Sequence, residues 1–107
     1  MSNQGNPDEA AINALSAKVM AQIPAILDKA DKFMTDVQME KLESHMQAMA
    51  RRSLTSESLP EFDTSLFDEV SPISKSLAQE VTDLFGNLPV EEALLLSIHF
   101  ETAQSKN

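Results

Sequence analysis

The sequence contains no cysteine, only two glycines and few basic residues. The absence of cysteine excludes disulfides, thiolate metal sites and a cysteine nucleophile, and it is compatible with a reducing cytosol. Eight Lys and Arg stand against 17 Asp and Glu, so the formal net charge is −9. Because nucleic-acid affinity comes largely from basic side chains that neutralise phosphates, we expect no direct DNA or RNA binding. Anionic membranes are disfavoured for the same reason, whereas a partner with a basic patch would be attracted.

Several targeting segments and catalytic motifs are also missing. The N-terminal stretch MSNQGNPDEAA has neither the basic nor the apolar region of a secretory signal, and the uncharged run at residues 93–98 is too short to span a bilayer. The sequence has no glycine-rich phosphate loop, no HExxH motif and no nucleophile elbow. We therefore expect a cytoplasmic protein that is not an enzyme, needs no cofactor and does not enter a membrane.

The residues that are present favour one helical domain. A chain of 107 residues with 42% hydrophobic residues is typical of a single globular domain. Few glycines, five prolines and little alternation of β-branched residues predict helices joined by short turns. We expect an all-α fold, a single compact five-helix bundle, with a flexible N-terminus at residues 1–6, one domain at residues 7–104 and a C-terminal tail at residues 105–107.

Capping residues predict where the helices begin and end. Three starts combine a capping side chain with a proline or a glutamine in the first turn: Asn6-Pro7, Thr35 with Gln38, and Ser71-Pro72. Gly86 is the residue type that most easily adopts the left-handed conformation after a helix end. Pro24 interrupts the first helix, and the sequence leaves open whether the following residues form the same helix or a second one.

Apolar residues at three- and four-residue spacing predict the buried faces. The expected inward residues are Ile12, Leu15, Val19, Ile23, Ile26, Leu27, Phe33, Met39, Leu42, Met46, Met49, Phe62, Leu66, Val70, Ile73, Leu77, Val81, Leu84, Ala93, Leu94, Leu95, Leu96, Ile98 and Phe100. The last helix, from Pro89 to about Ala103, is apolar around most of its circumference, so we expect it to be the most buried element.

The chain has two histidines, and each borders the apolar face of its helix. Taken alone, His45 and His99 are interpreted as packed residues with one ring nitrogen hydrogen-bonded. A zinc site with Glu43, Glu91 or Glu92 is disfavoured, because the two histidines lack the helical spacing that places two imidazoles on one metal. An acid/base pair of His99 with Glu91 or Glu92 is disfavoured too, since adjacent helical residues point about 100° apart.

The contexts of the two histidines together match a known pattern. Leu88-Pro89, Glu92-Ala93 and Ile98-His99-Phe100 match a Leu-Pro, two variable residues, Glu-Ala, and an apolar run that leads into an apolar-His-apolar step. His45 is followed seven residues later by Arg52, as in the first half of the pattern. Over residues 10–103 the chain resembles the PRD, the phosphotransferase-system regulation domain of bacterial antiterminators and transcriptional activators. This resemblance implies an all-helical, five-helix fold.

The resemblance also implies a function. In the family these histidines accept phosphoryl groups from the histidine-containing phosphocarrier protein or from sugar-transporter components, which changes dimer packing and switches an attached regulator. His99 and His45 are then the phosphoacceptor candidates, and Arg52 and Glu92 are family-pattern positions without assigned chemistry. The family often has an acidic residue before its early histidine, and this chain has Ser44 there, so His99 is the stronger candidate.

The resemblance covers one copy of the domain, whereas family members usually have two copies together with nucleic-acid-binding and transporter-like domains. We therefore expect a stand-alone module for transcription regulation that acts as a homodimer or through a separate regulator. The alternative is a helical scaffold or adaptor protein that has lost phosphoacceptor function. Glu92 lies two helical turns before His99, on the order of 10 Å along the axis, and is not expected to orient its ring.

Overall fold

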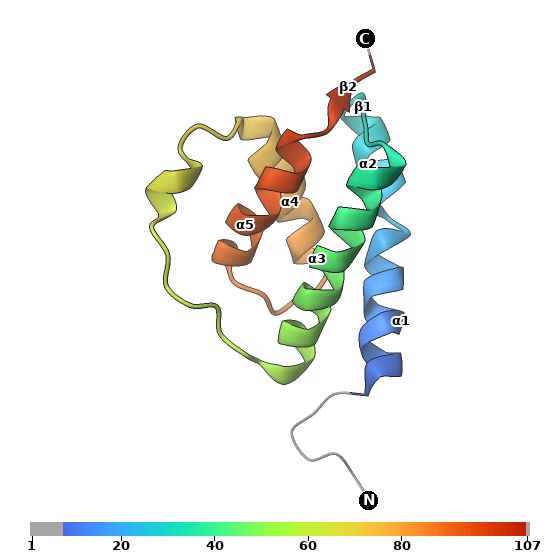
Figure 1. Cartoon of the computed structure of the whole chain (residues 1–107), viewed down its shortest axis with the longest axis vertical. Helices are drawn as coiled ribbons and strands as arrows, with labels where there is room; N and C mark the ends of the chain where they lie inside the picture. The colour runs from blue at the N-terminus through green and yellow to red at the C-terminus, as the bar shows by residue number, and fades with distance from the viewer. Residues whose placement is uncertain (1–7, 107) are drawn as a thin grey trace, which may run out of the picture.

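Residues 8–106 are described by a computed structural model and form a helical bundle (Figure 1). The helices are α1 (Glu9–Met20), α2 (Ile23–Lys29), α3 (Asp36–Thr55), α4 (Pro72–Asp83) and α5 (Val90–Glu101), with a one-turn 3-10 helix, η1 (Thr64–Phe67). Two short strands, β1 (Lys32–Phe33) and β2 (Gln104–Ser105), pair antiparallel. The all-α expectation is thereby confirmed, with this small sheet as an unpredicted addition.

Helices α1 and α2 form one interrupted helical rod. A turn at Ala21 and Gln22 separates them, and Pro24 lies in the first turn of α2. Because the first N–H groups of a helix have no intrahelical partner, proline costs no hydrogen bond there and the helix resumes at once. Residues 8–106 thus contain four helical rods, α1–α2, α3, α4 and α5, and the expected five-helix bundle was wrong in its count. The apolar segment around Leu66 adds only the single turn of η1.

The local signals that begin and end helices are largely confirmed. Thr35 and Gln38 form both hydrogen bonds of the capping box at the start of α3, and the Ser71 hydroxyl caps α4. Gly86 has φ +87°, the left-handed conformation expected after α4. At α1 the cap is Asp8, whose side chain accepts from the Ala10 N–H. The predicted cap at residues 6 and 7 and the predicted flexible residues 1–6 lie outside the described residues.

The core lies between two helical pairs. Helix α1 packs against α3 and α4 packs against α5, and the pairs meet where α3 contacts α5 and α2 contacts α4. The buried residues of this core are Val19, Ile23, Ile26, Leu27, Leu42, Met46, Met49, Leu77, Ala78, Val81, Ala93, Leu96, Phe100 and Ala103. Most of the predicted apolar faces are therefore buried, including the centre of α5.

Some apolar residues expected inside the core are exposed. Ile73, Leu84 and Ile98 expose 43%, 44% and 49% of their surface. Ile73 lies in the first turn of α4, Leu84 is its C-cap and Ile98 lies in the last turns of α5. Leu66 is exposed in η1, where its neighbour Phe67 is the buried residue. Phe33, expected on a helix, lies in β1 and is also exposed. Helical periodicity thus finds the inward direction of a helix but overestimates the width of its buried face.

The C-terminal segment is attached to the turn that follows α2. Lys32 pairs with Ser105 and Phe33 with Gln104. The Lys106 N–H donates to the Asp31 carbonyl over 2.9 Å, and the Lys106 ammonium is ion-paired with the Asp28 carboxylate. Residues 105 and 106, which we assigned to a tail, are therefore bound to the body of the domain.

The α1–α2 rod, residues 9–29, is the one described segment that is long and apolar enough to cross a membrane by length and composition. The uncharged run at residues 93–98, predicted from the sequence to be too short to span a bilayer, lies in α5 and is a different segment. The large apolar side chains of the rod, such as Ile12, Val19 and Ile23, are buried against the rest of the domain. One face of the rod therefore packs against the domain, as in an amphipathic helix of a globular protein.

Candidate functional site

The two histidines lie side by side although they come from different helices. His45 is near the middle of α3 and His99 is near the end of α5. Their ring centroids are 4.8 Å apart, with an angle of 44° between the ring planes. Both side chains are half-buried. The two phosphoacceptor candidates therefore form one site, which we call the histidine pair.

Both rings of the histidine pair are neutral at pH 7. Burial lowers the pKa of His45 from 6.5 to about 4, with smaller contributions from the charges of His99 and Arg52. Burial also lowers the pKa of His99, helped by the positive charge of Lys41. The Nε2 atom of His45 is buried and has no hydrogen-bond partner. A neutral imidazole keeps one nitrogen with a free lone pair, so each ring can act as a nucleophile or as a hydrogen-bond acceptor.

The two family-pattern positions without assigned chemistry, Arg52 and Glu92, bind each other. Arg52 Nε lies 2.6 Å from Glu92 Oε2, and Arg52 Nη2 lies 2.7 Å from Glu92 Oε1. This bidentate ion pair is largely removed from solvent, with side-chain exposures of 18% for Arg52 and 1% for Glu92. The hydrogen bonds to Glu92 raise the pKa of Arg52. We call it the arginine–glutamate pair.

The arginine–glutamate pair is in register with the histidine pair. Arg52 follows His45 by seven positions and Glu92 precedes His99 by seven, so α3 and α5 run antiparallel and meet at two points two helical turns apart. The sequence contained a signal for this contact. A basic and an acidic residue, each seven residues from a histidine and in opposite directions, match the spacing of an antiparallel contact. Without the packing of α3 on α5 that signal could not be read.

A second contact fixes the C-terminal end of α3. The Ser53 hydroxyl donates to Asn87 Oδ1 over 2.6 Å, and Asn87 Nδ2 donates to the Ser53 carbonyl over 2.9 Å. Asn87 lies in the turn that leads into α5. This end of the α3–α5 interface is therefore closed by satisfied polar contacts, whereas the other end contains the histidine pair.

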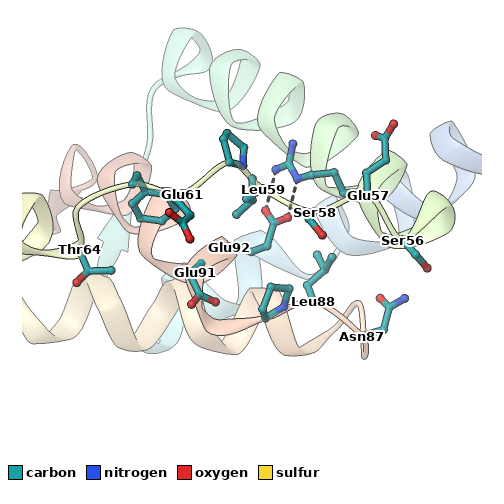
Figure 2. A pocket seen from close by; sticks show the side chains of 14 residues that line it. Ser56, Glu57, Ser58, Leu59, Glu61, Thr64, Asn87, Leu88, Glu91 and Glu92 are labelled. Atoms are coloured by element: carbon teal, nitrogen blue, oxygen red, sulfur yellow. Dashed lines mark hydrogen bonds and ion pairs between the residues drawn. The ribbon is translucent and has the colours of Figure 1, made fainter.

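A cavity of about 550 Å³ opens beside the arginine–glutamate pair (Figure 2). It lies between the loop after α3 and the turn before α5, and its lining includes Glu57, Leu59, Glu61, Leu88 and Glu91. Figure 2 shows Glu92 on its wall, with the ion pair drawn as dashed lines. The histidines are not among the lining residues. The cavity and the histidine pair are thus separate features of the same interface.

The described residues form neither the zinc site nor the acid/base pair of His99 with a glutamate that were disfavoured from the sequence. Within residues 8–106 no group of three or more His, Cys, Asp or Glu side chains is arranged to hold a metal ion. Both carboxylate oxygens of Glu92 are occupied by Arg52, and Glu91 is exposed at the cavity. The histidine pair is the described arrangement with unused hydrogen-bonding and nucleophilic capacity.

Comparison with known proteins supports the resemblance seen in the sequence. No protein-family model and no curated protein matches the chain. Among solved structures, the crystal structure of a PRD-containing transcription regulator from Lactobacillus casei is 33% identical to it, with a TM-score of 0.79. The match covers 100% of this chain and 97% of that one. The fold, its extent and this sequence identity together show that the chain belongs to the PRD family of transcription regulators.

Proposed function

We propose that this PRD-type regulatory module is switched by histidine phosphorylation within the sugar phosphotransferase system. One observation supports this most strongly. His45 and His99, chosen from separate halves of a sequence pattern, meet with ring centroids 4.8 Å apart, and both are neutral at pH 7. The buried Nε2 of His45, which has no hydrogen-bond partner, is a further feature of this pair.

The chemistry asked of the site is a phosphoryl transfer between imidazoles. The lone pair of the acceptor nitrogen forms a new P–N bond while the P–N bond of the donor's phosphohistidine breaks, and the electron pair of that bond returns to the donor ring. The attack requires an unprotonated nitrogen, which the lowered pKa values of His45 and His99 provide. His99 is the first acceptor in this proposal, since it is the less buried of the two.

The structural effect of phosphorylation follows from charge. A phosphoryl group adds about −1.5 to −2 charge and strong acceptor oxygens. A phosphoryl group on one ring of the histidine pair would clash with the other ring and bring charge into the apolar contact of α3 with α5. This end of the interface must then rearrange. A change in the α3–α5 surface would alter how the module packs against a second copy or a separate regulator.

The proposal includes the following partners and location. The phosphoryl donor is the phosphocarrier protein or a sugar-transporter component, and the module works in the cytoplasm as a homodimer or with a regulator. With a net charge of −9 the module acts without binding nucleic acid or membrane directly. In this proposal it is not itself an enzyme.

The test is intact mass at neutral pH after incubation with phosphoenolpyruvate, the general phosphotransferase enzyme and the phosphocarrier protein. The expected result is a gain of one or two phosphoryl groups, lost on acidification because phosphohistidine hydrolyses in acid. His99→Ala should remove most of the gain and His45→Ala with His99→Ala all of it. Labelling that persists in the double variant would contradict the proposal, and so would an unlabelled wild type exposed to each class of donor.

The alternative function is a helical scaffold or adaptor whose histidines are only packed residues. The burial of His45, with its pKa near 4, favours this alternative. The rate at which diethylpyrocarbonate modifies the two imidazoles distinguishes the two proposed functions. Rapid modification of both imidazoles supports acceptors that a donor can reach, and protection of both supports the scaffold.

A further inference from the structure

The charges that act on the histidine pair are positive, in a chain whose net charge is −9. Lys41 lowers the pKa of His99 and Arg52 lowers the pKa of His45. Within residues 8–106, neither histidine forms an ion pair with a carboxylate, and neither does Lys41. Positive side chains therefore lie near the histidine pair, and one that is not already paired would favour an anion there.

Lys41 and Arg52 differ in whether their charge is available. Arg52 is bound to both oxygens of Glu92 at the closed end of the interface. Lys41 is exposed and lies four residues before His45 on α3, on the same helical face. Residues at this spacing are neighbours, and the His45 ring in turn contacts His99. Lys41 thus brings an unpaired ammonium group to the edge of the histidine pair.

We infer that Lys41 and His99 form a small oxyanion site, in which the Lys41 ammonium binds phosphoryl oxygens beside the nitrogen of His99. The ligand class is a tetrahedral phosphate, either free or as the phosphoryl group of a phosphohistidine donor. For the second source the inference rests on the proposed function. Lys41 acts by charge and hydrogen bonding, and no proton transfer is required of it.

The first test uses nuclear magnetic resonance of the full chain with inorganic phosphate, against sodium chloride at equal ionic strength. Phosphate should shift the imidazole signals of His99 and the signals of Lys41. Lys41→Gln should lose this response and raise the pKa of His99, and Lys41→Arg should keep the response. The matched control is Lys18→Gln, an exposed lysine on α1, which lies on the other side of α3 from α5 (Figure 1). No shift of His99 in the wild type, or an unchanged response in Lys41→Gln, overturns the inference.

The second test follows covalent labelling by phosphoramidate, a small donor that needs no protein partner. Lys41→Gln should slow the labelling of His99 by about two- to fivefold, the range that one exposed charge pair supplies. Added salt should reduce the difference from the wild type. Lys18→Gln should label at the wild-type rate. Equal rates for Lys41→Gln and the wild type count against the site.

The two proposals fail in different ways. If free phosphate shifts His99 but no protein donor labels it, the oxyanion site stands and phosphorylation-dependent regulation falls. If the phosphocarrier labels the wild type and Lys41→Gln at the same rate, and phosphate shifts no signal, the proposed function stands and the role of Lys41 falls.

Discussion

Helices α3 and α5 touch through two side-chain pairs that have opposite properties. At one end Arg52 and Glu92 form a bidentate ion pair, with Glu92 only 1% exposed. At the other end the tilted rings of His45 and His99 lie with centroids 4.8 Å apart, and one buried nitrogen has no partner. The two pairs share the same helices and the same register. Their difference lies in how completely each pair satisfies its own polar groups.

The comparison distinguishes a contact whose polar groups are all satisfied from one whose polar groups can still bind a ligand. Arg52 and Glu92 satisfy each other, so a ligand would gain little there without breaking a buried ion pair. The histidines keep neutral nitrogens that can accept a proton or a hydrogen bond. The arginine–glutamate pair therefore holds one end of the interface fixed while the histidine pair leaves the other end open to change.

The largest expected effect comes from removing half of the arginine–glutamate pair. Arg52→Ala leaves the Glu92 carboxylate buried without a counter-charge. Such a loss typically lowers the free energy of unfolding by about 3–5 kcal/mol. Denaturant unfolding followed by circular dichroism measures it.

The control for this variant is the double replacement Arg52→Leu with Glu92→Leu. It removes both charges and refills the space with apolar atoms, so it should cost clearly less than Arg52→Ala. If the single variant is as stable as the wild type, the arginine–glutamate pair does not fix the interface.

A smaller effect is expected when the histidine pair is protonated. The pKa of His45 is about 4 in the folded chain and 6.5 as its ordinary value. Between these two pH values the unfolded chain binds a proton that folded His45 does not, so stability is complete above pH 6.5 and falls on acidification to pH 4. The loss is on the order of 2–3 kcal/mol. Urea unfolding at half-unit pH steps measures it, and the range above about pH 5.5 is largely free of carboxylate titration.

His45→Gln is the matched variant for this pH effect. It removes the titrating ring and should flatten the stability profile between pH 6.5 and 4.5. A profile as steep as in the wild type would mean that other groups cause the acid sensitivity, His99 first among them.

The smallest effect is expected at the neighbouring arginine. Arg51 forms an ion pair with Glu9 at 2.7 Å, about the same distance as in the buried pair, yet its partner is 68% exposed. Exposed ion pairs contribute about 0–1 kcal/mol, so Arg51→Ala should change the free energy of unfolding by less than about 1 kcal/mol. A loss as large as that of Arg52→Ala would show that burial does not explain the difference between these adjacent arginines.

Local features of the fold could be predicted from the sequence. The capping box of Thr35 and Gln38, the cap at Ser71 and the left-handed Gly86 each depend on a few neighbouring residues, and each was found as expected. The count of four helical rods was not, because the apolar segment around Leu66 forms only the single turn of η1. The sequence also left open whether Pro24 divides the first helix. Strands of two residues are too short to show an alternating pattern, so β1 and β2 had no sequence signal.

The site could be predicted as residues but not as an arrangement. The pattern named His45, His99, Arg52 and Glu92, and the structure joins them in two pairs. Helical periodicity gives the face of one helix but not the register of that helix against another one far along the chain. The role of Glu92 as the partner of Arg52 depends on that register.

The separation of contacting residues along the chain also bears on folding. Glu9 and Arg51 are 42 positions apart, Arg52 and Glu92 are 40 apart, and Asp28 and Lys106 are 78 apart. Closing such loops costs chain entropy that only the finished contacts repay. The histidine pair joins α3 to α5, so it exists only when the two helical pairs have docked, and a modification that loosens it acts on the contact between them.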